Sequence, residues 1–140
     1  MMRFETRDRV MAALLLGQVG KEKVIVWAHN GHIGRGIGYP VLGDHLRKAR
    51  QNGVYGVGLF ARSGKWREHW TGQVKPWGAA IDGLENRFTA DGAARFLPAS
   101  RIDQEVTAFE PENGGQVRFR PGQRFDGLIV VDELSPVEAP

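Results

Sequence analysis

The feature that most constrains the fold is a pair of short apolar segments with one amphipathic stretch between them. Residues 23–28 read Lys-Val-Ile-Val-Trp-Ala and residues 54–60 read Val-Tyr-Gly-Val-Gly-Leu-Phe, and such nearly continuous runs are typical of strands buried on both faces. Between them, residues 41–50 place apolar and charged side chains on opposite faces of a helix. The order strand, helix, strand predicts a right-handed parallel crossover. We therefore expect residues 1–140 to form one α/β domain, with a mainly parallel sheet flanked by helices.

The remaining elements are predicted from weaker patterns. We expect helices at residues 7–16 and 81–88, and strands at residues 94–97, 116–120 and 127–131. Thr6 is expected to cap the first helix. Residues 61–74 show no clear periodicity and are expected to form a loop.

Composition excludes several classes of protein. The chain has no cysteine, which excludes disulfides, thiolate metal sites and a cysteine nucleophile. Its net charge is only +3 and its basic residues are scattered from Arg3 to Arg124, so we expect no nucleic-acid partner. No apolar run approaches the roughly 18 residues of a membrane span, and the first residues are too polar for a signal peptide. We expect a cytoplasmic protein without a membrane partner.

A glycine-rich loop follows the first predicted strand and is the first candidate for an active site. In open α/β sheets, ligands bind beyond the carboxyl ends of the strands, and this loop places His29, Asn30 and His32 there. Imidazoles titrate near neutral pH and can act as base or electrophile. Two histidines in one such loop favour a functional role over plain packing. His45, on the apolar helix face, is expected to be a core or supporting residue, and His69 a surface loop residue.

Other chemistries have less support. A zinc site would need a third ligand beside the two loop histidines, and no spacing selects one among Asp44, Glu68, His69 and Glu85. We therefore expect neither a metal nor a cofactor. Residues 34–38 begin like a dinucleotide loop, but Tyr39 stands where its third glycine is required. No serine lies in a Gly-x-Ser-x-Gly elbow. The aromatic residues within 66–77 could line an apolar pocket or simply pack.

Several segments together resemble the erythromycin esterase family. The most specific is Trp-Ala-His-Asn-x-His at residues 27–32, which is followed by Leu-Gly-Asp-His-Leu at residues 42–46 and by the second predicted strand. Upstream, Arg7-Asp8 looks like part of the family's Arg-Asp helix, although Leu14 stands where the family has Asn. Downstream, residues 125–132 look like its closing strand. The resemblance covers most of the chain.

The resemblance implies an α/β architecture and hydrolysis of an ester by an activated water. The family includes enzymes that hydrolyse the lactone of macrolide antibiotics, so the implied substrate is a small-molecule ester or lactone and the implied role is antibiotic resistance. His29 and His32 match the family's second histidine pair and are implied as catalytic residues. Arg7 and Asn30 are implied as substrate-binding residues.

One motif of the family has no counterpart here. The family's N-terminal half carries Gly-Glu-x-x-His-Gly, which supplies the general base, and the sequence contains no such motif. The chain then resembles the C-terminal part of such a hydrolase. Two functions follow: an esterase whose site a partner completes, or an inactive ligand-binding or interaction module. Because a sheet without its neighbouring strands exposes edge groups and apolar surface, we expect association with a second copy or with an N-terminal partner chain.

Overall fold

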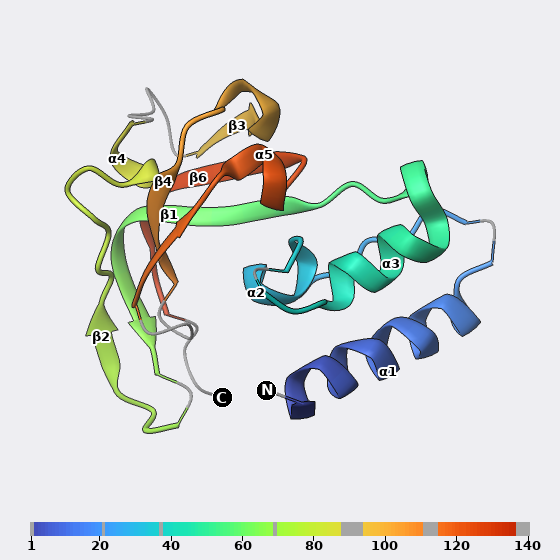
Figure 1. Ribbon diagram of the computed structural model, residues 1–140. Coiled ribbons are helices and arrows are strands. Elements are labelled where there is room, and N and C mark those ends of the chain that lie inside the picture. The colour runs from blue at the N-terminus through green and yellow to red at the C-terminus, as the bar shows by residue number, and fades with distance from the viewer. Residues whose placement is uncertain are drawn as a thin grey trace.

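The computed structural model describes residues 2–20, 22–36, 38–68, 70–87, 94–110 and 115–136. Helices α1 (Met2–Gln18), α2 (Asn30–Ile33) and α3 (Leu42–Arg50) come first, and the 3₁₀ turn η1 (Gln51–Gly53) follows them. The remaining elements are β1 (Val57–Arg67), β2 (Val74–Pro76), α4 (Leu84–Arg87), β3 (Ala94–Pro98), η2 (Ala99–Arg101), β4 (Val106–Glu110), β5 (Gly115–Phe119), α5 (Pro121–Arg124) and β6 (Gly127–Leu134). Figure 1 shows α1, α2 and α3 gathered near the start of β1.

The strands form two small sheets. The larger has the order β2-β1-β6-β3, and β4 pairs with β5 in the other. Within the described residues only β1 and β6 pair in parallel, whereas β2, β3 and the β4–β5 hairpin are antiparallel. The α/β class is thus confirmed, but the parallel content is smaller than predicted.

The core lies on one face of the larger sheet. Side chains alternate between the two faces of a strand, and Phe60 of β1 is buried on the same face as Leu128 and Val130 of β6. Phe119 and Phe125 cover them, each with its ring centroid 5.9 Å from that of Phe60. This cluster stabilises the larger sheet, beside which the candidate site lies.

The predicted strand at residues 23–28 is wrong for the structure of this chain. These residues have no regular secondary structure, and Ile25 and Trp27 are 93% and 86% exposed. A strand is stabilised by hydrogen bonds and packing from its neighbours, and no other segment of the described chain pairs with this one. The predicted parallel crossover therefore does not form.

Other boundaries also differ from the predictions. Helix α1 begins at Met2, so Thr6 lies inside it and does not cap it. Strand β1 continues to Arg67 through much of the predicted loop, because β2 pairs with its far end. The predicted helix at residues 81–88 shortens to α4, and residue 88 lies outside the described residues. Strand β4 was not predicted; it pairs with β5 in an antiparallel ladder.

Four of the predicted elements are confirmed. Helix α3 and strands β3, β5 and β6 occupy the segments predicted for them, with β6 running on to Leu134. In the described part of the chain, no helix is long and apolar enough to cross a membrane.

Candidate functional site

The Asn30 side chain binds the segment that carries the two histidines, residues 29–32, to strand β1. Its side-chain Nδ2 donates to the Leu59 carbonyl at 2.7 Å, and its Oδ1 accepts from the Leu59 amide at 2.9 Å. The buried amide thereby occupies one position on the edge of β1, much as a residue of a neighbouring strand would. These two bonds give Asn30 a structural role, and its predicted contact with substrate stays a prediction.

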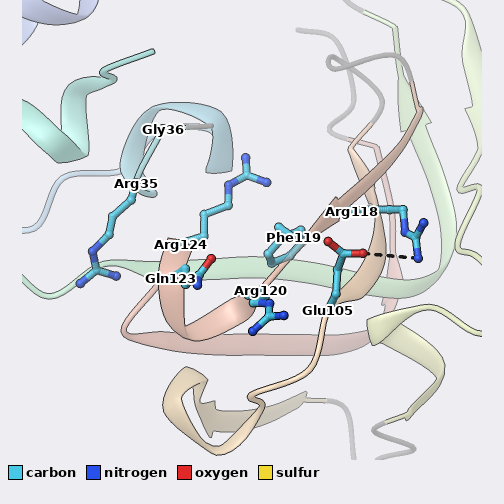
Figure 2. A pocket seen from close by; sticks show the side chains of 8 residues that line it. All are labelled: Arg35, Gly36, Glu105, Arg118, Phe119, Arg120, Gln123 and Arg124. Atoms are coloured by element: carbon cyan, nitrogen blue, oxygen red, sulfur yellow. Dashed lines mark ion pairs between the residues drawn. The ribbon is translucent and has the colours of Figure 1, made fainter. Parts of the chain in front are cut away.

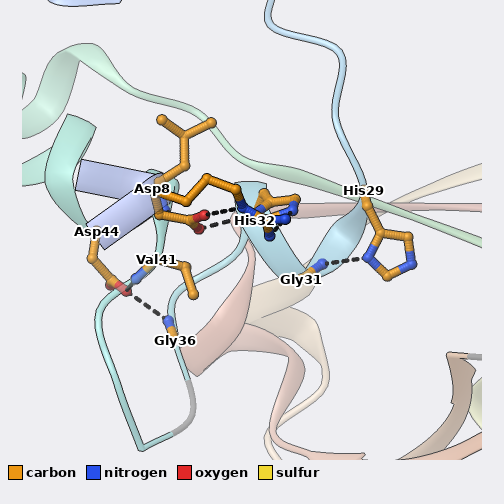
Figure 3. A network of polar contacts seen from close by, with 9 residues as sticks. Asp8, His29, Gly31, His32, Gly36, Val41 and Asp44 are labelled. Atoms are coloured by element: carbon orange, nitrogen blue, oxygen red, sulfur yellow. Dashed lines mark hydrogen bonds and ion pairs between the residues drawn. The ribbon is translucent and has the colours of Figure 1, made fainter. Parts of the chain in front are cut away.

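His29 caps the one-turn helix α2. Its ring Nδ1 accepts a hydrogen bond from the Gly31 amide at 3.1 Å. An acceptor nitrogen carries no proton, so the neutral ring holds its proton on Nε2. In Figure 3, His29 lies on the other side of α2 from His32. The structure therefore does not bring the two predicted catalytic histidines into contact.

His32 is held at both ring nitrogens by two residues of α1. Its Nδ1 lies 2.8 Å from Asp8 Oδ2, a contact drawn in Figure 3. Its Nε2 lies 2.9 Å from Arg7 Nη2. A guanidinium can only donate, so Nε2 is the acceptor and the ring proton sits on Nδ1, pointing at Asp8. The predicted pair Arg7 and His32 is thus brought together, and one tautomer is selected.

Asp8 is a site residue that the sequence patterns did not predict. It is 2% exposed, and its Oδ2 also accepts from the Leu42 amide at 3.0 Å. Leu42 N is one of the amides at the start of α3 that have no partner within the helix. One buried carboxylate thus joins α1, α2 and α3. The Arg-Asp pair of the resemblance is the signal that could have pointed to it.

Asp44 and two glycines shape the loop between α2 and α3. Asp44 Oδ2 accepts from the amides of Gly36 and Val41 at 2.8 and 3.0 Å. A Cβ on Gly43 would lie 2.2 Å from the Gly34 carbonyl oxygen, so only glycine lets α3 pack this closely on the loop. These contacts hold the loop that follows His32 against α3.

Asp126 anchors the opposite side of the same loop. It accepts from the Gly56 amide at 2.7 Å, from Arg35 at 2.8 Å and from Arg47 at 2.9 Å. Partial burial raises its pKa, but the hydrogen bond from Gly56 and those from Arg47 and Arg35 outweigh this and hold the pKa below the usual value. An ionised Asp126 therefore links the loop, α3, and the starts of β1 and β6.

An apolar groove of about 1170 Å³ opens beside this network. We call it the open groove: residues 22–30 line it, together with Leu59 and Ala61 of β1 and Ile129 and Val131 of β6. His29 and Asn30 lie on its wall, whereas Arg7 and His32 do not. Trp66 and Trp77 also line it, so part of the predicted aromatic stretch faces a pocket.

A second, smaller cavity of about 290 Å³ holds none of the predicted site residues. Figure 2 shows its lining, which is rich in arginine: Arg35, Gly36, Glu105, Arg118, Phe119, Arg120, Gln123 and Arg124. Most of these cations already have carboxylate partners, since Arg118 pairs with Glu105 and Arg124 with Glu110. The cavity therefore adds little to the candidate site.

The possible metal donors are engaged elsewhere. Glu85 accepts from the Phe109 amide and Glu68 binds Lys75 and Thr71, while Asp44 holds the loop amides. His69 lies outside the described residues. Among the residues that the structure describes, no three His, Asp or Glu side chains gather in a way that could hold a metal ion.

Comparisons with known proteins find one family and two solved structures. The family described as erythromycin esterase matches residues 1–134. A crystal structure of a Bacillus cereus protein superposes with a TM-score of 0.76 at 19% identity, over 98% of this chain and 40% of that one. A structure described as a succinoglycan biosynthesis protein gives a TM-score of 0.75 at 14% identity, over 94% of this chain and 39% of that one. None of the curated proteins matches. This chain thus spans about 40% of the length of the solved structures that it resembles.

Proposed function

The chain belongs to the erythromycin esterase family, and from this we propose that it is a hydrolase domain that splits an ester or a macrolide lactone with water. His29 and His32 are the proposed catalytic residues, and Arg7 and Asn30 the proposed contacts to substrate. The observation that carries the proposal is the chain of contacts from buried Asp8 through His32 to Arg7.

The His32 tautomer suits it to act as a base. With the proton on Nδ1, Nε2 is the basic nitrogen, and Asp8 is placed to stabilise the imidazolium that forms when Nε2 takes a proton. Arg7 occupies Nε2 in the free protein, and its side chain is half exposed. A substrate carbonyl that drew the guanidinium toward itself would release Nε2 and gain a donor for its developing negative charge.

The proposed hydrolysis proceeds in two stages. Water attacks the ester carbon and gives its proton to His32 Nε2. The carbon–oxygen bond to the alcohol breaks as the tetrahedral intermediate collapses, and the proton passes from His32 to the leaving oxygen. His29, which caps α2, is proposed to contact the substrate.

One observation favours the alternative, an inactive ligand-binding or interaction module. Both nitrogens of His32 are already engaged within the chain, so the ring must lose a contact before it can accept a proton. The sequence also lacks the family's Gly-Glu-x-x-His-Gly motif. In that case the chain binds a ligand or a partner without turnover.

An ester-hydrolysis assay separates the two functions. The chain is tested with an activated aryl ester and with a macrolide lactone, first alone and then co-produced with the part of the Bacillus cereus protein that it does not match. We expect activity above the buffer rate in at least one of these preparations, and a loss of about 100-fold in His32→Ala, since general acid–base catalysis contributes roughly 10²–10⁴-fold.

His29→Ala is expected to lower the rate as well. His45→Ala is the control, because the ring Nε2 of His45 has no hydrogen-bond partner in the described part of the chain and takes no part in the Asp8–His32–Arg7 contacts. If every preparation matches buffer, the esterase proposal is wrong and the binding module stands.

A further inference from the structure

We propose that the open groove is the docking surface for a complementing polypeptide, by which we mean the part of the fold that the two solved structures have and these 140 residues lack. The proposal concerns binding and stands whether or not the chain hydrolyses esters.

The first observation is the exposure of residues 23–28. Their sequence is that of a strand buried on both faces, yet Ile25 is 93% and Trp27 86% exposed, and Val24 is also exposed. Contiguous exposed apolar surface of this kind marks an interaction site. All of these side chains lie on the wall of the open groove.

The second observation is that one face of the larger sheet is only partly covered. Leu59 pairs with Ile129, and Ile129 pairs with Phe96, so these three side chains share the face opposite to Phe60 and Leu128. Leu59 and Phe96 are 38% and 53% exposed, whereas Phe60 and Leu128 are fully buried. Sheets with parallel strands in α/β proteins are normally covered on both faces. Leu59 and the half-buried side chains Ile129 and Val131 line the open groove.

The third observation is the edge of β1. Strand β2 pairs with β1 only at Lys65, Trp66 and Arg67. Along the rest of β1, on the side away from β6, the described residues supply no strand, and the Asn30 amide binds only at Leu59. An edge with unpaired backbone groups beside exposed apolar side chains is suited to accept an added strand.

The greater length of the two solved structures indicates what binds in the open groove. Nearly the whole of this chain superposes on less than half of each, so the greater part of each fold lies outside what this chain provides. The open groove, at about 1170 Å³, also exceeds the ~300–1,000 Å³ of pockets that enclose small ligands. A segment of polypeptide fits both facts, whereas a second copy or a small apolar molecule is a competing outcome.

The test mixes the purified chain with the unmatched part of the Bacillus cereus protein, co-produced if that part does not fold alone, and measures the complex by analytical ultracentrifugation and titration calorimetry. We expect a one-to-one complex and slower amide exchange in residues 23–28. Ile25→Asp should weaken binding about tenfold or more, because truncating a central anchor typically does so. Trp27→Lys should act in the same way.

Ile81→Asp is the matched control, since Ile81 is 90% exposed and does not line the open groove. Both isoleucine variants should keep the thermal unfolding midpoint of the unaltered chain, because neither side chain is buried in it. The proposal is overturned if no complex forms, if Ile25→Asp and Ile81→Asp bind alike, or if the chain alone dimerises and Ile25→Asp makes it monomeric, in which case a second copy covers the open groove.

Discussion

Asp8 is the residue on which the geometry of the candidate site depends. Its Oδ2 serves both His32 Nδ1 and the Leu42 amide in a buried position. Asp8→Ala leaves both donors without their acceptor, and unsatisfied buried donors cost about 1–3 kcal/mol each. We expect the free energy of unfolding, measured with urea at pH 7, to fall by at least that amount.

The matching control is Asp82→Ala, because Asp82 lies at an exposed turn. Its effect should stay within about 0.5 kcal/mol. Nitrogen NMR of His32 gives a second readout: the Nδ1-protonated tautomer in the unaltered chain, and a mixture in Asp8→Ala. An unchanged tautomer in the variant would show that Asp8 does not set it.

Glu85 is expected to make the fold less stable as the pH rises, whereas a carboxylate paired with a cation makes a fold less stable as the pH falls. Burial raises the pKa of Glu85, the amide hydrogen bonds from Phe109 and from its own backbone oppose the rise, and nearby Glu110 adds to it. A carboxyl whose folded pKa exceeds its unfolded value stabilises the fold fully below the unfolded pKa, and this stabilisation is lost as pH rises through the folded pKa.

Glu85→Gln removes that ionisation and keeps an oxygen to accept from Phe109. We expect the variant to unfold at a higher urea concentration than the unaltered chain at pH 8, with an advantage that shrinks as the pH is lowered toward 4. A difference in urea midpoint that stays constant across this range would contradict the assignment.

At the scale of elements, local patterns predicted those elements whose partners lie within this chain. Helix α3 has its apolar face, and β6 lies between β1 and β3, so pattern and neighbours agree. Residues 23–28 have the clearest strand pattern and form no strand. Such a pattern indicates that a strand needs neighbours on both faces, and the described part of this chain does not provide them. Strand β4, by contrast, is created by its hairpin partner β5.

The residues of the candidate site were also predicted only in part. The loop histidines were accessible to sequence reasoning because they follow an apolar run, and the resemblance added Arg7. The contacts of Asp8 with His32 and Leu42, and of Asp126 with Gly56, span 24, 34 and 70 positions along the chain. Such long-range contacts are set by tertiary packing, which no local periodicity encodes.

At the scale of the whole molecule, the local stability against opening is expected to differ between segments. The central strand β6 has a neighbour on each side, and its Leu128 and Val130 belong to the core. Residues 24–28 pair with no strand of the described chain, and Val24, Ile25 and Trp27 are exposed. Since the protection of an amide reflects the free energy of the opening that exposes it, the two segments should differ widely in one experiment.

Native-state hydrogen exchange by NMR tests this difference on the isolated chain. We expect the amides of residues 128–131 to be the slowest, with exchange approaching the rate of global unfolding, and those of residues 24–28 to exchange near the rate of an unstructured peptide. Comparable protection of the two segments would mean that residues 23–28 already occupy a strand in the isolated chain. The prediction from their sequence would then be right, and the open groove would be closed without any partner.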